Sequence, residues 1–278
     1  MEYTLESLFS VAGKCIVVAG GTSGIGLELA SALRQLGANV AVLGVGEQAT
    51  QAALAHLEGI SAPGSVMAFT ADVTDESQVR DVFARIHGGL GRVDGLINSA
   101  GINRIEALHS GSIDNFSRVM DVNLKGMVIC CKYAGRYMLR QNYGRIVNIS
   151  SLSSIRGKSF YTAYASSKAA VNGFTRALAV EWAKNNITVN AIAPGMIVTE
   201  INRKQVEANP DSFLKRIESI PRGCAGKEQW LVAPVVMLLS DGAPHLTGQT
   251  IFCDGGSSIG DTFIMEKEKQ GPLKLDEE

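Results

Sequence analysis

Short apolar runs rich in β-branched residues alternate along most of this chain with longer stretches in which apolar residues recur three and four positions apart. The first pattern is typical of strands buried on both faces, and the second is typical of amphipathic helices. Regular alternation of the two predicts βα units around a parallel sheet. The predicted strands are residues 14–19, 39–43, 65–71, 94–98, 145–149, 187–192 and 250–253.

One complete βαβ unit is predicted at the start of the chain. Between the first two strands an apolar residue recurs every three or four positions, and Gly37 stands where a helix C-cap is expected. The apolar positions of this helix are Ile25, Leu29, Leu33 and Leu36.

The overall composition indicates a single domain and argues against several kinds of partner. The 278 residues are 46% hydrophobic, enough for one sizeable core, and a net charge of −1 creates no broad field for binding a nucleic acid or an anionic membrane. No run of 18 apolar residues is present, and Glu2 and Glu6 stand where a secretion signal would carry positive charge. We therefore expect a cytoplasmic protein with a domain at residues 8–260 and a charged tail at 261–278.

The cysteines and histidines lack the spacing of metal ligands, so no metal site is predicted. The cysteines are odd in number and form no C-x-x-C pair, and we interpret them as small buried side chains. The histidines are scattered and are interpreted as structural or surface residues. These residues are Cys15, Cys130, Cys131, Cys224 and Cys253, with His56, His87, His109 and His245.

A glycine-rich turn joins the first predicted strand to the helix that follows it. From Ala19 the chain reads Ala-Gly-Gly-Thr-Ser-Gly-Ile-Gly. Glycines let the backbone turn tightly and approach a pyrophosphate, whose charge is met by free N–H groups at the helix N-terminus. The residues predicted to form this nucleotide site are Gly20, Thr22, Ser23, Gly24, Ile25 and Gly26.

Tyr164 and Lys168 lie four residues apart, which places them on one face of a helix. A surface tyrosine–lysine pair is the alternative interpretation of this motif alone. A phenol with a pKa of about 10 is a poor base at neutral pH, and a nearby ammonium favours its phenolate. The helix itself is supported by an apolar stripe at Val171, Phe174, Leu178 and Trp182.

Together these motifs resemble the short-chain dehydrogenase/reductase family, which moves a hydride between a nicotinamide dinucleotide and a carbonyl or secondary alcohol. The loop has the family spacing G-x-x-x-G-x-G, with Ala19 in the place of its threonine. Ser151 stands thirteen residues before Tyr164, and Asn123 lies in Val-Asn-Leu-Lys-Gly, so the chain holds the family's tetrad of Asn, Ser, Tyr and Lys. The resemblance covers residues 8–256 and implies an α/β, single-domain, Rossmann-type doubly wound fold with a seven-stranded parallel sheet.

The resemblance also implies a role for each member of the tetrad. Tyr164 acts as the general acid/base, and Ser151 donates a hydrogen bond to the substrate oxygen as charge develops there. Lys168 favours the phenolate and binds the nicotinamide ribose, while Asn123 holds a water that links the lysine to solvent. The expected substrate residues are Ser151, Ser153, Tyr164 and Arg104.

Three further segments match family positions for the cofactor, and two of them have a plainer alternative. Asp72 and Val73 match the pair that touches adenine, and a helix cap is the alternative for Asp72. A second segment matches the family's N-N-A-G, with Ser99 in place of the second asparagine. A third matches the backbone that holds the nicotinamide carboxamide, and a generic Pro-Gly turn is the alternative. The last two segments supply Asn98, Ala100 and Gly101, and Pro194, Gly195, Ile197 and Thr199; Tyr164 and Lys168 are also expected to contact the cofactor.

The choice between NAD and NADP is normally read at the end of the second strand. Gly44 stands where NAD-type members carry aspartate, and neither Ser23 nor Val45 supplies the positive charge that NADP-type members place there. Binding NADP with no cation beside its 2′-phosphate costs more free energy than binding NAD without the usual carboxylate at its 2′-hydroxyl. Glu47 would also repel the phosphate from close range. We therefore favour NAD over NADP.

Substrate selectivity is expected in a mobile lid at residues 196–222, and also at Arg104, Ser153 and Arg156. The sequence of residues 181–187 and 220–223 resembles the branch that acts on sugar acids, such as gluconate 5-dehydrogenase and 2-dehydro-3-deoxygluconate 5-dehydrogenase. Such a carboxylate would be bound by a guanidinium, for which Arg104 and Arg203 are candidates.

Two other functions are alternatives to a sugar-acid dehydrogenase. A 3-oxoacyl-carrier-protein reductase would share the tetrad, favour NADP and need a basic patch for its acidic carrier, and the sequence shows neither. A nucleotide-binding regulator without chemistry would not need all four tetrad residues.

The family members are mostly tetramers, so we expect a homo-oligomer, either a tetramer or a dimer. An interface helix is predicted at 126–143, with core packing as the alternative for its Met127, Cys130 and Met138. The segment Phe263-Ile264-Met265 could anchor the tail on a neighbouring subunit, and a mobile tail is the alternative.

Overall fold

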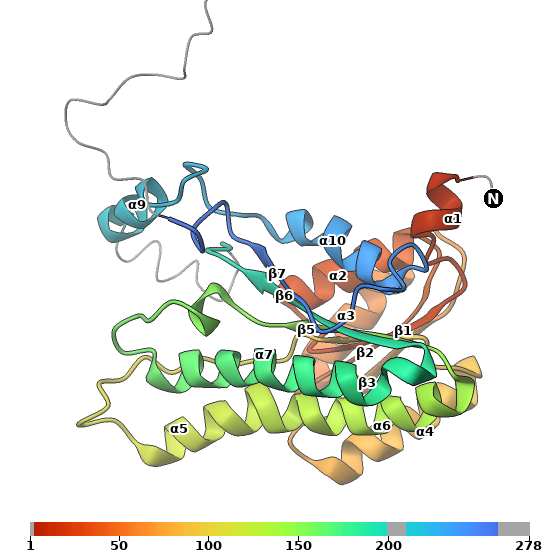
Figure 1. Ribbon diagram of the computed structural model, residues 1–278. Helices are drawn as coiled ribbons and strands as arrows, with labels where there is room; N and C mark the ends of the chain where they lie inside the picture. The colour runs from red at the N-terminus through yellow and green to blue at the C-terminus, as the bar shows by residue number, and fades with distance from the viewer. Residues whose placement is uncertain (1–2, 199–209, 261–278) are drawn as a thin grey trace, which may run out of the picture.

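A single parallel sheet forms the centre of the computed structural model, which describes residues 3–198 and 210–260 (Figure 1). Its strands are β1 (Cys15–Ala19), β2 (Asn39–Gly44), β3 (Val66–Thr70), β4 (Gly95–Asn98), β5 (Gly144–Ile149), β6 (Ile187–Pro194) and β7 (Thr250–Cys253). Within the described residues the order is β3-β2-β1-β4-β5-β6-β7, and every neighbouring pair is parallel. The chain therefore winds outward from β1 in both directions, which confirms the doubly wound fold.

Two layers of helices cover the sheet, one on each face (Figure 1). Alternate residues of β1 face the two layers, because successive side chains of a strand point to opposite faces: Val17 joins one apolar cluster, and Ile16 and Val18 join the other. The layer with Ile16 comprises α2 (Gly24–Gln35), α3 (Glu47–Glu58) and α10 (Val232–Leu239). The layer with Val17 comprises α4 (Glu76–Leu90), α6 (Gly126–Gln141) and α7 (Thr162–Trp182).

Shorter elements connect these layers. The helix α5 (Ile113–Met120) runs through a π-helical turn, η1 (Asp121–Lys125), directly into α6. Three 3-10 turns follow: η2 (Leu152–Ser154) after β5, η3 (Ala183–Asn185) after α7, and η4 (Glu228–Leu231) before α10. The remaining described helices are α1 (Leu5–Phe9) and α9 (Pro210–Glu218).

The strand predictions are confirmed to within one or two residues, the largest difference being β6, which continues to Pro194. In the first βαβ unit Leu29 and Leu33 are buried as predicted, and Gly37 has a φ of +82°, which suits the residue after a helix end. Leu36 does not belong to the buried stripe: it caps α2 and is 48% exposed. The lid at 196–222 stays a prediction: its residues 210–218 form the helix α9, and residues 199–209 lie outside the described part.

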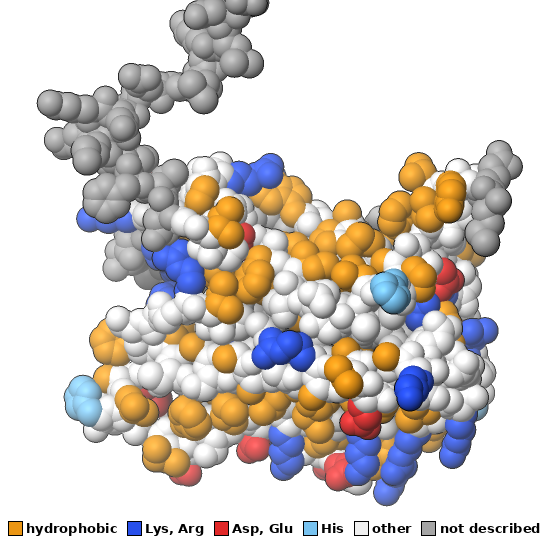
Figure 2. Space-filling view, viewed as in Figure 1, with side chains coloured by type: hydrophobic (Ala, Val, Ile, Leu, Met, Phe, Trp, Pro, Cys, Tyr) orange, Lys and Arg blue, Asp and Glu red, His pale blue; other side chains and the backbone are white. Residues whose placement is uncertain are grey.

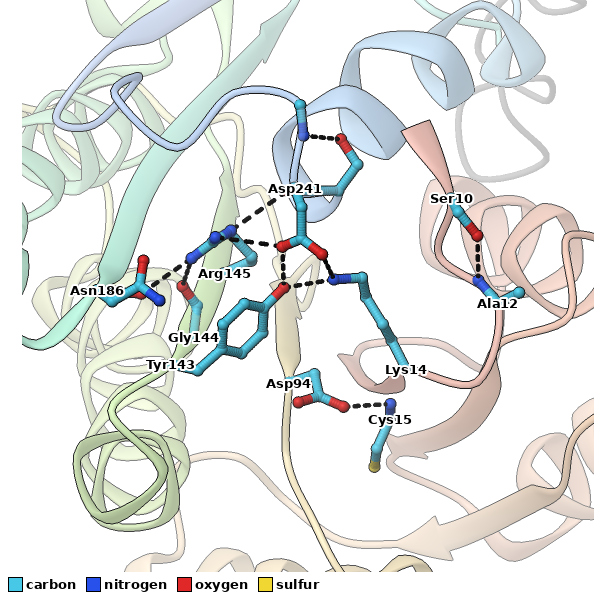
Figure 3. Close-up of polar contacts among 12 residues, drawn as sticks. Ser10, Ala12, Lys14, Cys15, Asp94, Tyr143, Gly144, Arg145, Asn186 and Asp241 are labelled. Atoms are coloured by element: carbon cyan, nitrogen blue, oxygen red, sulfur yellow. Dashed lines mark hydrogen bonds and ion pairs between the residues drawn. The ribbon is translucent and has the colours of Figure 1, made fainter. Parts of the chain in front are cut away.

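A polar cluster closes the edge at which the strands begin (Figure 3). The Asp241 carboxylate accepts hydrogen bonds from Lys14 Nζ and Tyr143 Oη, both at 2.7 Å, and pairs with Arg145 Nη2 at 3.3 Å. The guanidinium of Arg145 and the ammonium of Lys14 both lie over the Tyr143 ring. Since Lys14 precedes β1 and Tyr143 precedes β5, this cluster ties the segment after α10 to the edge opposite the carboxyl ends of the strands.

The structure shows whether the methionines and cysteines named from the sequence are buried. Met127, Cys130 and Met138 are buried within this chain, so they pack in the core rather than at a subunit interface. The prediction of buried cysteines holds for Cys15, Cys130 and Cys131. It is wrong for Cys224 and Cys253, which are partly exposed along one cavity. No group of His, Cys, Asp or Glu in the described residues could hold a metal ion. The tail at 261–278 lies outside the described part.

Candidate active site

The four tetrad residues come from three elements around the carboxyl ends of β4 and β5. Ser151 lies two residues beyond the end of β5 and is the N-cap of η2, where its side chain accepts a hydrogen bond from the Ser153 amide at 3.1 Å. Tyr164 and Lys168 lie one turn apart in the first half of α7. Asn123 lies in the π-helical turn between α5 and α6. The structure therefore gathers residues that are far apart along the chain.

Ser151 and Tyr164 lie close together, and the Ser151 hydroxyl acts on the pKa of the Tyr164 phenol. Burial raises the pKa of the Tyr164 phenol, the Ser151 hydroxyl offsets part of this, and the neighbouring Tyr161 phenol raises it further. The rings of Tyr161 and Tyr164 meet edge to face, 6.2 Å apart. The side chains around Tyr164 therefore raise its pKa by themselves, whereas a lowered pKa was expected.

Lys168 is buried beneath Tyr164. Its Nζ lies 5.7 Å from the Tyr164 ring centroid and donates a hydrogen bond to the Ile149 carbonyl at 2.7 Å. Burial lowers the pKa of Lys168 from 10.5 to about 8, because an ammonium loses hydration in the interior. The side chain can therefore change its charge close to neutral pH.

Asn123 is held rigidly by backbone and side-chain groups. Its Oδ1 accepts from the Ile102 amide at 2.8 Å, and its Nδ2 donates to the Ile102 carbonyl and to Ser167 Oγ, each at 3.0 Å. Ser167 in turn donates to the Tyr164 carbonyl at 2.7 Å. Ser167 was not predicted as a site residue, although its position three residues after Tyr164 places it one helical turn away on the same helix.

The loop after β4 connects the tetrad to the glycine turn. A Cβ on Gly101 would lie 3.4 Å from Asn123 Oδ1 and 3.7 Å from Lys168 Nζ. A Cβ on Gly20 would lie 2.4 Å from the Ala100 amide nitrogen, so the glycine turn packs against this same loop. The candidate cofactor and catalytic residues thus form one continuous surface.

The glycine turn fits a dinucleotide pyrophosphate. Gly20 has a φ of +78° and Gly24 a φ of +51°, and a Cβ on Gly26 would overlap the Gly20 carbonyl oxygen. Ser23 is the N-cap of α2, and its side chain makes no capping hydrogen bond there. The first-turn N–H groups of α2 are therefore available to an anion.

Other predicted cofactor residues are engaged by the protein. Asp72 accepts from Thr74 at 2.8 and 2.9 Å and pairs with Arg118 at 3.0 Å, while the N-cap of α4 is Asp75. The capping alternative for Asp72 is therefore wrong. Burial raises the pKa of Asp72, and the bonds from Thr74 and Arg118 outweigh it, so that the pKa is lowered.

Val73 and Asn98 point into the protein. A Cβ on Gly126 would lie 2.6 Å from Val73 Cγ2, because this side chain is packed in the core. Asn98 Nδ2 donates to Asn148 Oδ1 at 2.8 Å, deep between β4 and β5. Only the backbone of these two residues can therefore face a cofactor.

The segment after β6 borders a cavity of about 260 Å³. Gly195 packs against Asp254, since a Cβ would lie 2.7 Å from the Asp254 Cα, and Ile197 forms a bridge with Gly226. Thr199 and Arg203 lie outside the described residues. The cavity is lined by Met196, Ile197, Ile220, Arg222, Cys224, Gly226, Trp230, Leu231, Phe252, Cys253, Asp254, Gly255 and Gly256.

The predicted selectivity residues lie on two neighbouring loops. The backbone amide of Glu106 donates to the Phe160 carbonyl at 3.1 Å, which joins the loop after β4 to the loop before α7. Arg104 is exposed on the first loop, and Arg156 on the second donates to the Ser257 carbonyl at 2.7 Å. Phe160 has a φ of +68°, a strained backbone for a bulky residue.

Comparison with known proteins agrees with this geometry. Residues 19–258 match a family model described as enoyl-(acyl carrier protein) reductase. The chain is 36% identical to a 3-oxoacyl-[acyl-carrier-protein] reductase of Thermotoga maritima, over 89% of this chain and 98% of that protein. It is 35% identical to a 2-dehydro-3-deoxy-D-gluconate 5-dehydrogenase of Dickeya dadantii, over 89% of this chain and 96% of that protein.

A solved structure is similar to this chain over most of its length. A putative NAD(P)-dependent gluconate 5-dehydrogenase from Beutenbergia cavernae, with NADP bound at low occupancy, superimposes with a TM-score of 0.83. It is 34% identical, and the match covers 90% of this chain and 98% of that one.

The sheet order, the glycine turn and the tetrad define a dinucleotide-dependent oxidoreductase. The chain belongs to the short-chain dehydrogenase/reductase family, an NAD(P)-binding family whose members act on CH–OH groups. No helix among the described residues is both long enough and apolar enough to cross a membrane.

Proposed function

We propose that this chain interconverts a secondary alcohol and a ketone on a small polar substrate, with Tyr164 as the general acid/base. The observation that carries the proposal is the position of Tyr164, which lies beside Ser151 with the buried Lys168 Nζ 5.7 Å from its ring centroid. In oxidation, the substrate hydroxyl gives its proton to the Tyr164 phenolate while the carbon loses a hydride. In reduction, the same phenol returns the proton to the carbonyl oxygen.

The other tetrad residues support this proton transfer. Ser151 donates to the substrate oxygen when that oxygen carries negative charge. Lys168 supplies positive charge beneath the phenolate, and with a pKa of about 8 it can pass a proton onward at neutral pH. Asn123 holds the Ile102 backbone, so its part is to position the loop beside the lysine.

The nicotinamide dinucleotide accepts or supplies the hydride when it is bound. The surface formed by the glycine turn, the loop after β4 and the segment after β6 would hold it. We propose NAD as the preferred cofactor, since neither Ser23 nor Val45 carries a positive charge for a 2′-phosphate. The proposed contacts are Gly20, Thr22, Ser23, Gly24, Ile25, Gly26, Asp72, Val73, Asn98, Ala100, Gly101, Tyr164, Lys168, Pro194, Gly195, Ile197 and Thr199.

We propose a sugar or sugar acid as the substrate. The two loops that flank Tyr164 carry the cations Arg104, Arg156 and Lys158, which suit a hydroxylated or carboxylated molecule. The similarity to 2-dehydro-3-deoxy-D-gluconate 5-dehydrogenase supports this class. Ser153, beside Ser151, is the proposed polar contact to a second hydroxyl.

A 3-oxoacyl-carrier-protein reductase is the second candidate, and two observations favour it. One is the 36% identity to the Thermotoga maritima enzyme. The other is the helix α6, which carries Lys132, Arg136 and Arg140 and no acidic residue, with Lys132 paired to Glu76 of α4 at 2.6 Å. Lys and Arg side chains gather at the lower right of the molecule, where α4 and α6 lie (Figure 2).

Absorbance at 340 nm separates the two candidates. Purified protein is incubated with NAD or NADP and a panel of sugars and sugar acids, or with NADH or NADPH and acyl-thioester ketones. An NAD-linked signal with a hydroxy or keto acid supports the first candidate. An NADPH-linked reduction of acyl thioesters, with no signal on acids, would replace it with the second.

We also propose a cytoplasmic homo-oligomer, a dimer or tetramer, with one domain at 8–260 and a lid at 196–222. Val180 on α7 is 81% exposed and Leu139 on α6 is 37% exposed, and such apolar side chains suit a subunit interface. A monomeric mass in light scattering would contradict the oligomer.

A further inference from the structure

The adenosine end of the proposed cofactor site departs from the usual arrangement, because Thr22 occupies the space in front of position 44. A Cβ on Gly44 would lie 2.4 Å from Thr22 Oγ1 and 2.8 Å from Thr22 Cγ2. Thr22 belongs to the glycine turn, which is fixed to the end of β2 by the Gly20 amide donating to the Leu43 carbonyl at 2.8 Å. The side chain of Thr22 therefore fills the space into which an acidic residue at 44 would project.

A carboxylate nevertheless reaches this edge from the first turn of α3. Thr70 Oγ1 donates to Glu47 Oε2 at 2.7 Å, and Gln51 Nε2 donates to Glu47 Oε1 at 2.8 Å. Thr70 is the register partner of Gly44 in the sheet. The Glu47 carboxylate is thus hydrogen-bonded to the side chain of Thr70. Thr70 lies beside Gly44 in the sheet, about one strand spacing (4.8 Å) away.

The charge of Glu47 is fixed there and is not neutralised by either partner. Thr70 and Gln51 are both uncharged donors, and they lower the pKa of Glu47, the bond from Gln51 more than that from Thr70. The cation Arg118 pairs with Asp72 at 3.0 Å, so this neighbouring pair adds no net positive charge.

We infer that Glu47, and not a residue at the end of β2, sets the cofactor preference of this chain by repelling a 2′-phosphate on the adenosine ribose. The inference rests on the proposed function. A phosphate carries between one and two negative charges at neutral pH, so it is repelled by Glu47, whereas the 2′-hydroxyl of NAD is neutral.

Calorimetric titration of the full chain with NAD and with NADP tests this without any substrate. The wild-type chain should bind NAD more tightly than NADP. In Glu47→Gln the ratio of the two dissociation constants should fall about tenfold, because NADP binding improves. NAD affinity should change less than threefold, because both carboxylate oxygens already accept protein hydrogen bonds.

Glu58→Gln is the matched control, since Glu58 is the exposed last residue of the same helix, about 16 Å along its axis. It removes the same charge and should leave the ratio unchanged. Higher ionic strength should reduce the discrimination in the wild type and in Glu58→Gln, and have little effect in Glu47→Gln.

An unchanged ratio in Glu47→Gln, with NAD still bound, would overturn this inference and leave the proposed function intact. Failure of the wild-type chain to bind either dinucleotide would overturn both. A shift of equal size in Glu58→Gln would show that net charge, rather than the position of Glu47, governs the preference, and would also overturn the inference.

Discussion

Replacing Lys168 by methionine should make the protein more stable and inactive at the same time. Methionine has a similar length, so it fills the buried space beneath Tyr164 without a charge. The pKa of Lys168 falls from 10.5 to about 8 on burial, which corresponds to a cost of about 3 kcal/mol for the charged form at pH 7. Loss of the hydrogen bond to the Ile149 carbonyl costs about 1 kcal/mol. The net gain at pH 7 is therefore about 2 kcal/mol.

The pH dependence distinguishes this cause from better packing. The folded pKa lies below the unfolded value, so the unfolded chain binds more protons between about pH 8 and pH 10.5. Stability of the wild type relative to Lys168→Met should therefore rise across this window. The advantage of the variant should vanish by about pH 10, where the remaining cost of the charge is under about 1 kcal/mol.

Urea unfolding followed by circular dichroism at pH 7 and pH 10 measures both quantities. Lys184→Met is the matched control, because Lys184 is exposed just beyond the same helix, and its stability should stay within about 0.5 kcal/mol of the wild type. A less stable Lys168→Met at pH 7, or an equal gain at both pH values, would show that burial of the Lys168 charge does not destabilise the wild type.

Three more changes test other parts of the account. Ser151→Ala should lower kcat by about 10² to 10³ in steady-state assays while the melting temperature is kept, since it removes a hydrogen-bond donor at the reacting oxygen; a wild-type kcat would exclude that role. Gly20→Ala should lose dinucleotide binding in calorimetry and at least about 2 kcal/mol of stability in urea, because its Cβ meets Ala100 and its φ is +78°; an intact binding isotherm would contradict the fit of the glycine turn. Asp241→Asn should lose about 1 kcal/mol at pH 7. Burial opposes ionisation of Asp241, but Lys14 and Tyr143 outweigh it and lower its pKa, so the loss should disappear as the pH falls below 3.8; a pH-independent loss would point to packing instead.

The parts of the fold that depend on short-range patterns could be predicted from the sequence. Strand positions follow from apolar runs such as residues 187–192, and the glycine turn follows from a spacing that only glycine geometry explains. Ser151, Tyr164 and Lys168 keep a fixed separation because one short connection joins β5 to α7. Their meeting could therefore be predicted without coordinates.

Contacts between distant segments could not be predicted in this way. The clash between Thr22 and a side chain at Gly44, the pairing of Asp72 with Arg118, and the two bonds that fix Asn123 to Ile102 join residues 21 to 46 positions apart. The π-helical turn that carries Asn123 leaves no signal in the apolar periodicity.

The pKa of Tyr164 also could not be predicted from the sequence. The pattern predicts that Lys168 and a bound oxidised nicotinamide together lower the pKa of Tyr164; in the protein by itself, burial dominates and raises this pKa. Burial is a property of the packed core, so the motif Tyr-x-x-x-Lys does not report it.

Turnover and dinucleotide binding of Tyr164→Phe test whether Tyr164 transfers the proton. The phenylalanine keeps the ring and removes only the hydroxyl. With the substrate found in the 340 nm assay, we expect a loss of kcat by several orders of magnitude, with the dissociation constant for the dinucleotide within a few-fold of the wild type. A variant with near-normal kcat would show that Tyr164 is not the general acid/base.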